Sequence, residues 1–366
     1  MTPMIQVTKP FLPPSSEYKE LLDGVWERNW LTNNGPLVQQ LEAELKEFLG
    51  VSHVHFVTNG TIALQLAIKA LDLHGEIITT PFSYVATTSS IVWENTTPVF
   101  ADIDPLTLNI DPKEVEKRIT PKTTAILAAH VYGIPCAVED LKAIANKNGL
   151  KIIYDGAHAF GARLNGKSLL NWGDISTCSF HATKLFHTIE GGGVFTANPE
   201  IHERLGFLKN FGHHGFDKYA MLGVNGKNSE FHAAMGIVNM RYVKGLIQKR
   251  AMIAGWYDKK LLNLNLQRPS VPEGCEYNYA YYPVIFNTET SLLQAFQFLQ
   301  KNQVFARRYF YPSLEKLPYI KHEPYCNVAE DYSRRILCLP FYDSLKEEEV
   351  SRICRLIMES QTISTC

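Results

Sequence analysis

Lys184 and Asp155 are the two residues of this chain whose types and positions most clearly suggest chemistry. Asp155 follows the apolar run Lys151–Tyr154, and Lys184 lies further along in the segment Ser-Phe-His-Ala-Thr-Lys. Pyridoxal phosphate, as an enzyme cofactor, needs a lysine amine for a Schiff base and a carboxylate that keeps its pyridine nitrogen protonated. A lysine at such a position is ordinarily a solvated surface residue. The Lys184 and Asp155 pair therefore indicates this chemistry only together with further residues of the site.

The turn at residues 58–61, Thr-Asn-Gly-Thr, is a candidate phosphate site. It lies between the strand-like run Val54–Val57 and the segment Ile62–Leu71, whose alanine and leucine content predicts a helix. The first N–H groups and the dipole of a helix favour a phosphate at such a place, and the Ser179 hydroxyl could add a contact. An ordinary helix cap by the Thr58 or Asn59 side chain explains the same turn.

Tyr84 and His158 complete the candidate site. Tyr84 stands at the next strand-to-helix junction and offers a flat face to an aromatic ring, and His158 could donate to an oxygen on that ring. Either side chain could equally pack in the core. The other histidines lack a paired acid at useful spacing, so we expect no metal site. The sequence has no Gly-x-Ser-x-Gly motif of the kind that carries the nucleophile of many serine hydrolases.

Composition sets the frame for these motifs. The 366 residues are 45% hydrophobic and 20% charged with a net charge of −1, which is typical of a globular protein and predicts neither a nucleic-acid partner nor a membrane span. The N-terminus lacks a secretory pattern. The seven cysteines are scattered and odd in number, which fits a reducing compartment, and we expect a cytoplasmic protein.

Strand-like and helical runs alternate through the first part of the chain. The expected strands are 54–57, 76–79, 98–101, 125–128 and 151–154, and the expected helices are 38–49, 62–71, 84–93 and 138–148. Such alternation predicts an α/β fold with a mostly parallel sheet covered by helices on both faces. Ligands in such folds bind at the carboxyl ends of the strands, where Thr58, Asp155 and the Ser179 segment fall.

The pattern changes in the last third of the chain. A long helical stretch over 240–262 precedes two strand-like segments, Tyr279–Ile285 and Phe305–Tyr311. We therefore predict a large domain with an N-terminal arm over residues 1–240 and a smaller α+β domain over residues 241–366.

Taken in order, these motifs make the chain resemble the DegT-type sugar-nucleotide aminotransferases, which are fold type I pyridoxal phosphate enzymes. The resemblance covers nearly the whole chain. The matching segments are residues 30–36, 58–64, 98–104, 130–133, 155–161, 179–184, 190–192 and 223–230, with Ala233-Ala234 after them.

The resemblance implies a role for each candidate. Lys184 would form the Schiff base and move protons, Asp155 would pair with the pyridine nitrogen, and His158 would bind the ring oxygen. Tyr84 would stack on the ring. The phosphate would be held by Gly60, Thr61 and Ser179.

The resemblance also implies a homodimer with shared active sites. Asn225 would reach the phosphate of the cofactor in the other subunit. Many relatives have Asn-Tyr-Arg where this chain has Asn225-Gly226-Lys227. Because lysine and arginine are not interchangeable, the role of Lys227 stays open.

The reaction implied is a two-stage transamination with L-glutamate as amino donor and a nucleotide-linked keto sugar as acceptor. The residues around Lys184 resemble those of enzymes that aminate C4, and most of all those that make dTDP-4-amino-4,6-dideoxyglucose for a surface polysaccharide such as the lipopolysaccharide O-antigen. Three alternatives stay open: amination at C3, a sugar dehydratase, and a non-catalytic relative. A dehydratase of this fold has histidine in place of the lysine, so Lys184 speaks against it.

Overall fold

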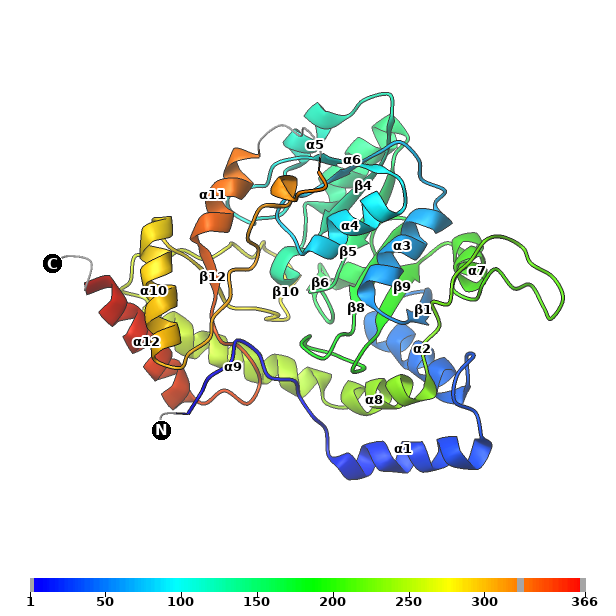
Figure 1. Cartoon of the computed structure of the whole chain (residues 1–366), viewed down its shortest axis with the longest axis horizontal. Helices are drawn as coiled ribbons and strands as arrows, with labels where there is room; N and C mark the ends of the chain where they lie inside the picture. Colours follow the sequence, from blue (N-terminus) through cyan, green and yellow to red (C-terminus); the bar gives the residue numbers. More distant parts are fainter. Residues whose placement is uncertain (1–2, 321–325, 363–366) are drawn as a thin grey trace.

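A mixed β-sheet lies at the centre of the computed structural model, which describes residues 3–320 and 326–362 (Figure 1). Over these residues the sheet has seven strands in the order β1-β9-β8-β5-β4-β2-β3. They are β1 (His53–Val57), β2 (Glu76–Thr79), β3 (Thr97–Phe100), β4 (Thr123–Ala129), β5 (Lys151–Asp155), β8 (Ile175–Ser179) and β9 (Gly192–Thr196). Neighbours from β3 to β8 run parallel, and β9 runs antiparallel to β8 and β1. The predicted mostly parallel sheet is confirmed.

Helices cover both faces of this sheet. Ile77 and Ile153 point to one face, which is covered by α3 (Gly60–Ala70), α4 (Val85–Trp93) and α7 (Pro199–Leu208). Their neighbours Ile78 and Ile152 point to the other, where α5 (Pro112–Arg118) and α6 (Val138–Asn148) pack beside α2 (Pro36–Leu49) and α8 (Glu230–Met240). Since successive strand residues alternate between faces, a strand covered on both sides must be apolar throughout. The expected strands show that pattern.

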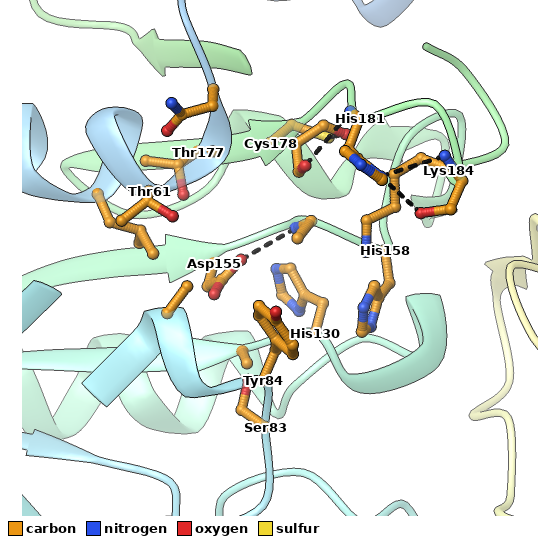
Figure 2. A pocket seen from close by; sticks show the side chains of 18 of the residues that line it. Thr61, Ser83, Tyr84, His130, Asp155, His158, Thr177, Cys178, His181 and Lys184 are labelled. Atoms are coloured by element: carbon orange, nitrogen blue, oxygen red, sulfur yellow. Dashed lines mark hydrogen bonds between the residues drawn. The ribbon is translucent and has the colours of Figure 1, made fainter. Parts of the chain in front are cut away.

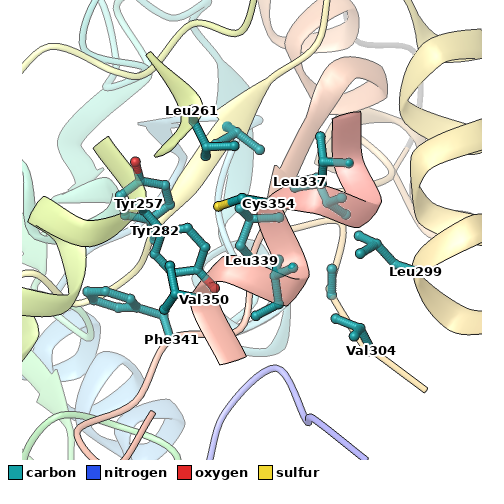
Figure 3. Close-up of a cluster of buried hydrophobic side chains, with 14 of the residues drawn as sticks. Tyr257, Leu261, Tyr282, Leu299, Val304, Leu337, Leu339, Phe341, Val350 and Cys354 are labelled. Atoms are coloured by element: carbon teal, nitrogen blue, oxygen red, sulfur yellow. The ribbon is translucent and has the colours of Figure 1, made fainter. Parts of the chain in front are cut away.

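The C-terminal part of the chain has its own apolar core (Figure 3). Its elements are α9 (Val243–Leu261), β11 (Pro283–Ile285), α10 (Glu289–Lys301), α11 (Asn327–Arg335), β12 (Ile336–Cys338) and α12 (Glu347–Thr362). The chain start joins this core, because the Ile5 amide donates to the Gln303 carbonyl (2.9 Å) and the Ile5 side chain is buried there. α1 (Ser15–Arg28) follows this arm. The boundary at residues 240/241 stays a prediction.

Short strands make a small second sheet. They are β6 (Arg163–Leu164), β7 (Lys167–Ser168) and β10 (Cys275–Glu276). β10 comes from the C-terminal part of the chain and pairs with β6, so this sheet ties the two parts together.

One expected strand in the C-terminal part is wrong, another is shorter than expected, and the expected long helix is present. Phe305–Tyr311 is not a strand, although Arg307 makes an isolated bridge with Cys338, and only Pro283–Ile285 of the segment 279–285 is one. Both segments are rich in aromatic residues, which suit a pleated half-buried surface, but here several of those rings line a cavity. The long helical stretch expected over 240–262 is α9, which begins at Val243 after a short break at Arg241–Tyr242 that follows α8.

Glu230 joins the beginnings of two helices. Its side chain is fully buried, and its two carboxylate oxygens accept hydrogen bonds from the amides of Leu37 (2.9 Å) and Val38 (3.0 Å) in the first turn of α2. A Cβ at Gly35 would lie 2.6 Å from the Glu230 carboxyl carbon. The carboxylate thus satisfies amides that have no acceptor within their own helix.

We expect Glu230→Gln to lower the free energy of unfolding by about 2–3 kcal/mol, because an amide group can accept from only one of the two N–H groups and carries no charge. Urea denaturation followed by circular dichroism measures this change. Glu47→Gln, an exposed change on α2, which is the helix that Glu230 caps, serves as the control. Its free energy of unfolding should stay within about 0.5 kcal/mol of the wild-type value. Equal midpoints for the two variants would contradict the capping role.

Candidate active site

A cavity of about 570 Å³ opens at the carboxyl ends of β1, β4, β5 and β8 (Figure 2). It is the place where a parallel sheet is expected to bind its ligand. The candidates that line it are Gly60, Thr61, Tyr84, Asp155, His158, Ser179 and Lys184. The structure therefore brings together residues that are up to 124 positions apart in the sequence.

One end of the cavity is formed by the N-terminus of α3. Asn59 caps this helix, because its side-chain oxygen accepts from the Ile62 amide (2.9 Å). The amides of Gly60 and Thr61 occupy the first helical positions, which have no acceptor within the helix. A Cβ at Gly60 would lie 2.8 Å from the Ser179 Cβ, so glycine lets the turn pack against Ser179. The same turn thus contains a helix cap by Asn59 and two amides, of Gly60 and Thr61, that could bind an anion.

Asp155 ends β5 and is buried, with 8% of its surface exposed. One carboxylate oxygen accepts from the Ala157 amide (3.0 Å) and the other from the Thr87 hydroxyl (2.7 Å). Burial raises the pKa of Asp155 above its ordinary value, and these two hydrogen bonds and the charge of Lys184 oppose that rise. The group is therefore a desolvated carboxylate whose charge depends on a few donors.

Lys184 reaches into the same cavity from the loop after β8 (Figure 2). Its Nζ donates to the Tyr281 hydroxyl at 3.3 Å. Burial lowers the pKa of Lys184, while the negative charge of Asp155 opposes this effect. A lowered pKa increases the fraction of neutral amine, which is the form that attacks a carbonyl and accepts a proton.

His158 is held as a hydrogen-bond donor. Its Nδ1 lies 3.2 Å from the Tyr132 amide, which donates to it, so the ring proton of the neutral form is on Nε2. Burial keeps the pKa of His158 well below its ordinary value, and the positive charge of Lys184 adds to this. The ring therefore stays neutral and presents an N–H group near the cavity.

Tyr84 and Asn225 have different positions. Tyr84 precedes the first turn of α4, lines the cavity and is 53% exposed, so its ring face is available. Asn225 is exposed and lies outside the lining of the cavity; it makes an isolated backbone bridge with Asn210. An asparagine that reaches the cofactor of another subunit would lie outside the cavity of its own chain, as Asn225 does. The role of Asn225 stays a prediction.

The motifs did not identify the wall of the cavity that comes from the C-terminal part. This wall consists of Tyr281, Arg307, Tyr309 and Phe310. A detectable signal was the tyrosine-rich run 277–282, since clustered tyrosines suit a half-wet wall. Thr87, which donates to Asp155, was also missed because nothing distinguishes it from other helical threonines.

The chain matches the model of the DegT/DnrJ/EryC1/StrS aminotransferase family over residues 15–358. It is 40% identical to a dTDP-4-amino-4,6-dideoxy-D-glucose transaminase of Shigella dysenteriae, over 97% of this chain and 98% of the relative. A UDP-N-acetyl-3-dehydro-alpha-D-glucosamine 3-aminotransferase of Acidithiobacillus ferrooxidans is 32% identical over 87% and 86% of the two chains. The solved structure of DesI with its TDP-sugar product has a TM-score of 0.94, 30% identity and coverage of 100% and 96%.

The chain therefore belongs to the DegT/DnrJ/EryC1/StrS aminotransferase family, and it is an enzyme that uses pyridoxal 5′-phosphate. The cavity fits this cofactor. It offers free helix amides for the phosphate, a buried carboxylate for the ring nitrogen, and a lysine amine. In the described part of the chain no cluster of His, Cys, Asp or Glu could hold a metal ion, and no helix is long and apolar enough to cross a membrane.

We expect Lys184→Ala to lower turnover more than about 1,000-fold, because general acid–base transfer by a positioned group is worth about 10²–10⁴. The variant should still bind pyridoxal phosphate noncovalently, since the contacts at Gly60, Thr61 and Ser179 remain. Turnover assays and equilibrium dialysis against the cofactor measure the two effects. Lys46→Ala, an exposed change on α2, should leave both unchanged. Near wild-type turnover in pure Lys184→Ala protein would rule out the assignment.

Proposed function

We propose that this aminotransferase moves an amino group from L-glutamate to C4 of dTDP-4-keto-6-deoxy-D-glucose. The product is dTDP-4-amino-4,6-dideoxyglucose. The reaction takes place in the cytoplasm and supplies an amino sugar for a surface polysaccharide such as the lipopolysaccharide O-antigen. The observation that carries the proposal is the 40% identity, over almost the full length of both chains, to a transaminase named for this product.

Position C4 is favoured over C3. The relative named as a 3-aminotransferase shares less of the sequence, 32%, and covers less of this chain, 87%. The residues Ser179-Phe-His181 before Lys184 also resemble those of enzymes that act at C4. An intact Lys184 that contacts Tyr281 in the cavity speaks against a dehydratase and against a non-catalytic relative.

Pyridoxal phosphate supplies a carbon that carries the amino group between donor and acceptor and a ring that delocalises the electron pair left when a C–H bond breaks. Lys184 Nζ moves the proton in each half of the reaction. The Tyr281 hydroxyl, 3.3 Å away, holds this amine whenever it is free. The lowered pKa of Lys184 favours the neutral amine that the transfer requires.

Asp155 and His158 govern the charge of the bound ring. The Asp155 carboxylate would pair with the pyridine nitrogen and keep that nitrogen protonated. His158 would donate from Nε2 to the ring oxygen, because the Tyr132 amide already occupies its Nδ1. Tyr84 would cover one face of the ring and exclude water from it.

We propose a homodimer in which residues 211–224 and Asn225 reach the partner. This segment projects between α7 and α8 (Figure 1) and is held by its own backbone bonds, His214 to Lys218 (2.9 Å) and Ala220 to Gly212 (2.8 Å). It nevertheless exposes large apolar side chains, with Phe216 at 99% and Leu222 at 88% exposure. Exposed apolar groups on an ordered segment mark an interaction surface, and a second copy of the chain is the occupant we propose.

The test of the proposed reaction is to identify its product. We expect purified enzyme with dTDP-4-keto-6-deoxy-D-glucose, L-glutamate and pyridoxal phosphate to form a sugar with nitrogen on C4. NMR with ¹⁵N-glutamate assigns the aminated carbon by its coupling. L-Alanine and L-ornithine as donors are the controls and should be much slower. Amination at C3, or turnover only with a different nucleotide, would overturn the substrate assignment but leave aminotransfer intact.

Hybrid dimers test the shared site. Each Lys184→Ala homodimer lacks the reactive amine, and each Asn225→Ala homodimer should retain cofactor poorly because it loses a charge-assisted hydrogen bond worth about 1.5–3 kcal/mol. In a hybrid, both defects fall in one site, and the other site has a normal Lys184 and a normal Asn225. We therefore expect the mixture to gain activity over the average of its parents at limiting pyridoxal phosphate.

Native mass spectrometry confirms that the subunits have exchanged, and activity is then assayed during a cofactor titration. A mixture of wild-type chains and Lys184→Ala chains is the control for exchange alone. If confirmed hybrids show no gain over the parental average, Asn225 acts within its own subunit or has no role in cofactor binding.

A further inference from the structure

We propose that the buried hydroxyls of Thr87 and Ser83 form a relay that positions the Asp155 carboxylate for the ring nitrogen of the cofactor. This inference rests on the proposed role of Asp155. Thr87 is a positioning residue, since it acts on the ring only through the carboxylate.

The direction of each hydrogen bond in the relay follows from proton counting. The Thr87 hydroxyl lies 2.7 Å from Asp155 Oδ2 and 2.8 Å from the Ser83 hydroxyl. A carboxylate can only accept, so the single proton of Thr87 goes to Asp155. Ser83 must then donate its own proton to Thr87. Such a chain polarises the Thr87 hydroxyl and strengthens its bond to the carboxylate.

The behaviour of Thr87 differs from that of a neighbouring buried hydroxyl on the same helix. Ser90 bonds back to the Ala86 carbonyl of its own helix at 2.7 Å, which is the usual arrangement for a helical serine. Thr87 is fully buried and instead bonds across to the end of β5. Ser90 therefore provides a matched control, because its hydroxyl is also buried but does not touch the carboxylate.

The relay also fixes how Asp155 is oriented. The Ala157 amide donates to Oδ1 and the Thr87 hydroxyl donates to Oδ2, so each oxygen is fixed by one donor and keeps a lone pair that can accept another hydrogen bond. Lys184 is the cation that acts on Asp155, and the buried thiols of Cys136 and Cys178 also interact with its charge. The neutral His158 ring lines the same cavity. Ser83 appears beside Tyr84 at the same end of the cavity in Figure 2.

Removing the Thr87 hydroxyl should change the charge of Asp155 in a predictable direction. Burial raises the pKa of Asp155, and the Thr87 hydrogen bond is the first of the groups that lower it. Without that bond the pKa of the carboxyl rises further, so the ionised form is lost at a higher pH as the solution is acidified. The acid limb of the pH profile should therefore move to higher pH.

The experiment compares Thr87→Val, Thr87→Ser and Ser90→Ala, each reconstituted with ¹⁵N-labelled pyridoxal phosphate. The ¹⁵N chemical shift of the ring reports whether its nitrogen is protonated and does not depend on turnover. At fixed neutral pH, we expect Thr87→Val to move this shift toward the unprotonated value and Thr87→Ser to restore it. Ser90→Ala should match the wild type. The glutamate half-reaction, followed by absorbance against pH, should show the displaced acid limb only in Thr87→Val.

Two further variants separate the possible failures. Asp155→Asn should abolish ring protonation; if it does not, the proposed role of Asp155 itself is wrong. If Asp155→Asn abolishes it while Thr87→Val keeps the wild-type ¹⁵N shift and acid limb, the relay alone is wrong. Circular dichroism verifies that each variant folds. If Thr87→Val does not fold, Ser83→Ala replaces it; this variant leaves Thr87 in place and should move the ¹⁵N shift in the same direction by a smaller amount. An unchanged shift in a folded Ser83→Ala protein would then overturn the relay.

Discussion

The need to keep a carboxylate charged inside the protein constrains the whole cavity. A buried charge is costly unless hydrogen bonds replace its water, and Asp155 receives such bonds from the Ala157 amide and the Thr87 hydroxyl. The first requires the chain to turn immediately after β5, and the second requires α4 to begin beside that strand end. Gly156 permits the turn, because a Cβ there would lie 2.4 Å from a Leu170 methyl carbon.

Parallel topology supplies the remaining groups at this position. β1, β5 and β8 end at the same edge, so the α3 turn, Asp155 and Ser179 converge although they are distant in sequence. The lysine follows β8 by only a few residues and reaches back over the same edge. The opposite wall comes from the C-terminal part, where Tyr281 accepts from Lys184. The Lys184 amine is therefore held between the two parts of the chain.

Sequence reasoning predicted the half of the cavity that is encoded locally. Asp155 and Ser179 end strands, and Gly60 and Thr61 follow one closely; the ends of such apolar runs are visible in a sequence as changes of residue type. The wall formed by Tyr281 and Tyr309 has no such marker, because its segment is irregular and its aromatic residues also suit a strand. That ambiguity produced the wrong strand over residues 305–311. The contact between Thr87 and Asp155 depends on how a helix is docked on the sheet, which no local pattern specifies.

Some of the segments that reveal the family resemblance act through architecture rather than chemistry. Gly35-Pro36 and Glu230 lie far apart in the sequence, yet the Glu230 carboxylate caps α2 at the point where only a glycine fits. Asn228, two residues before Glu230, donates to the carbonyls of Val57 (3.2 Å) and Glu190 (3.1 Å). The segment 223–230 is thereby fixed against β1, whose carboxyl end leads directly into the turn at Asn59–Thr61. The strand that positions this turn therefore also fixes the segment that contains Asn225.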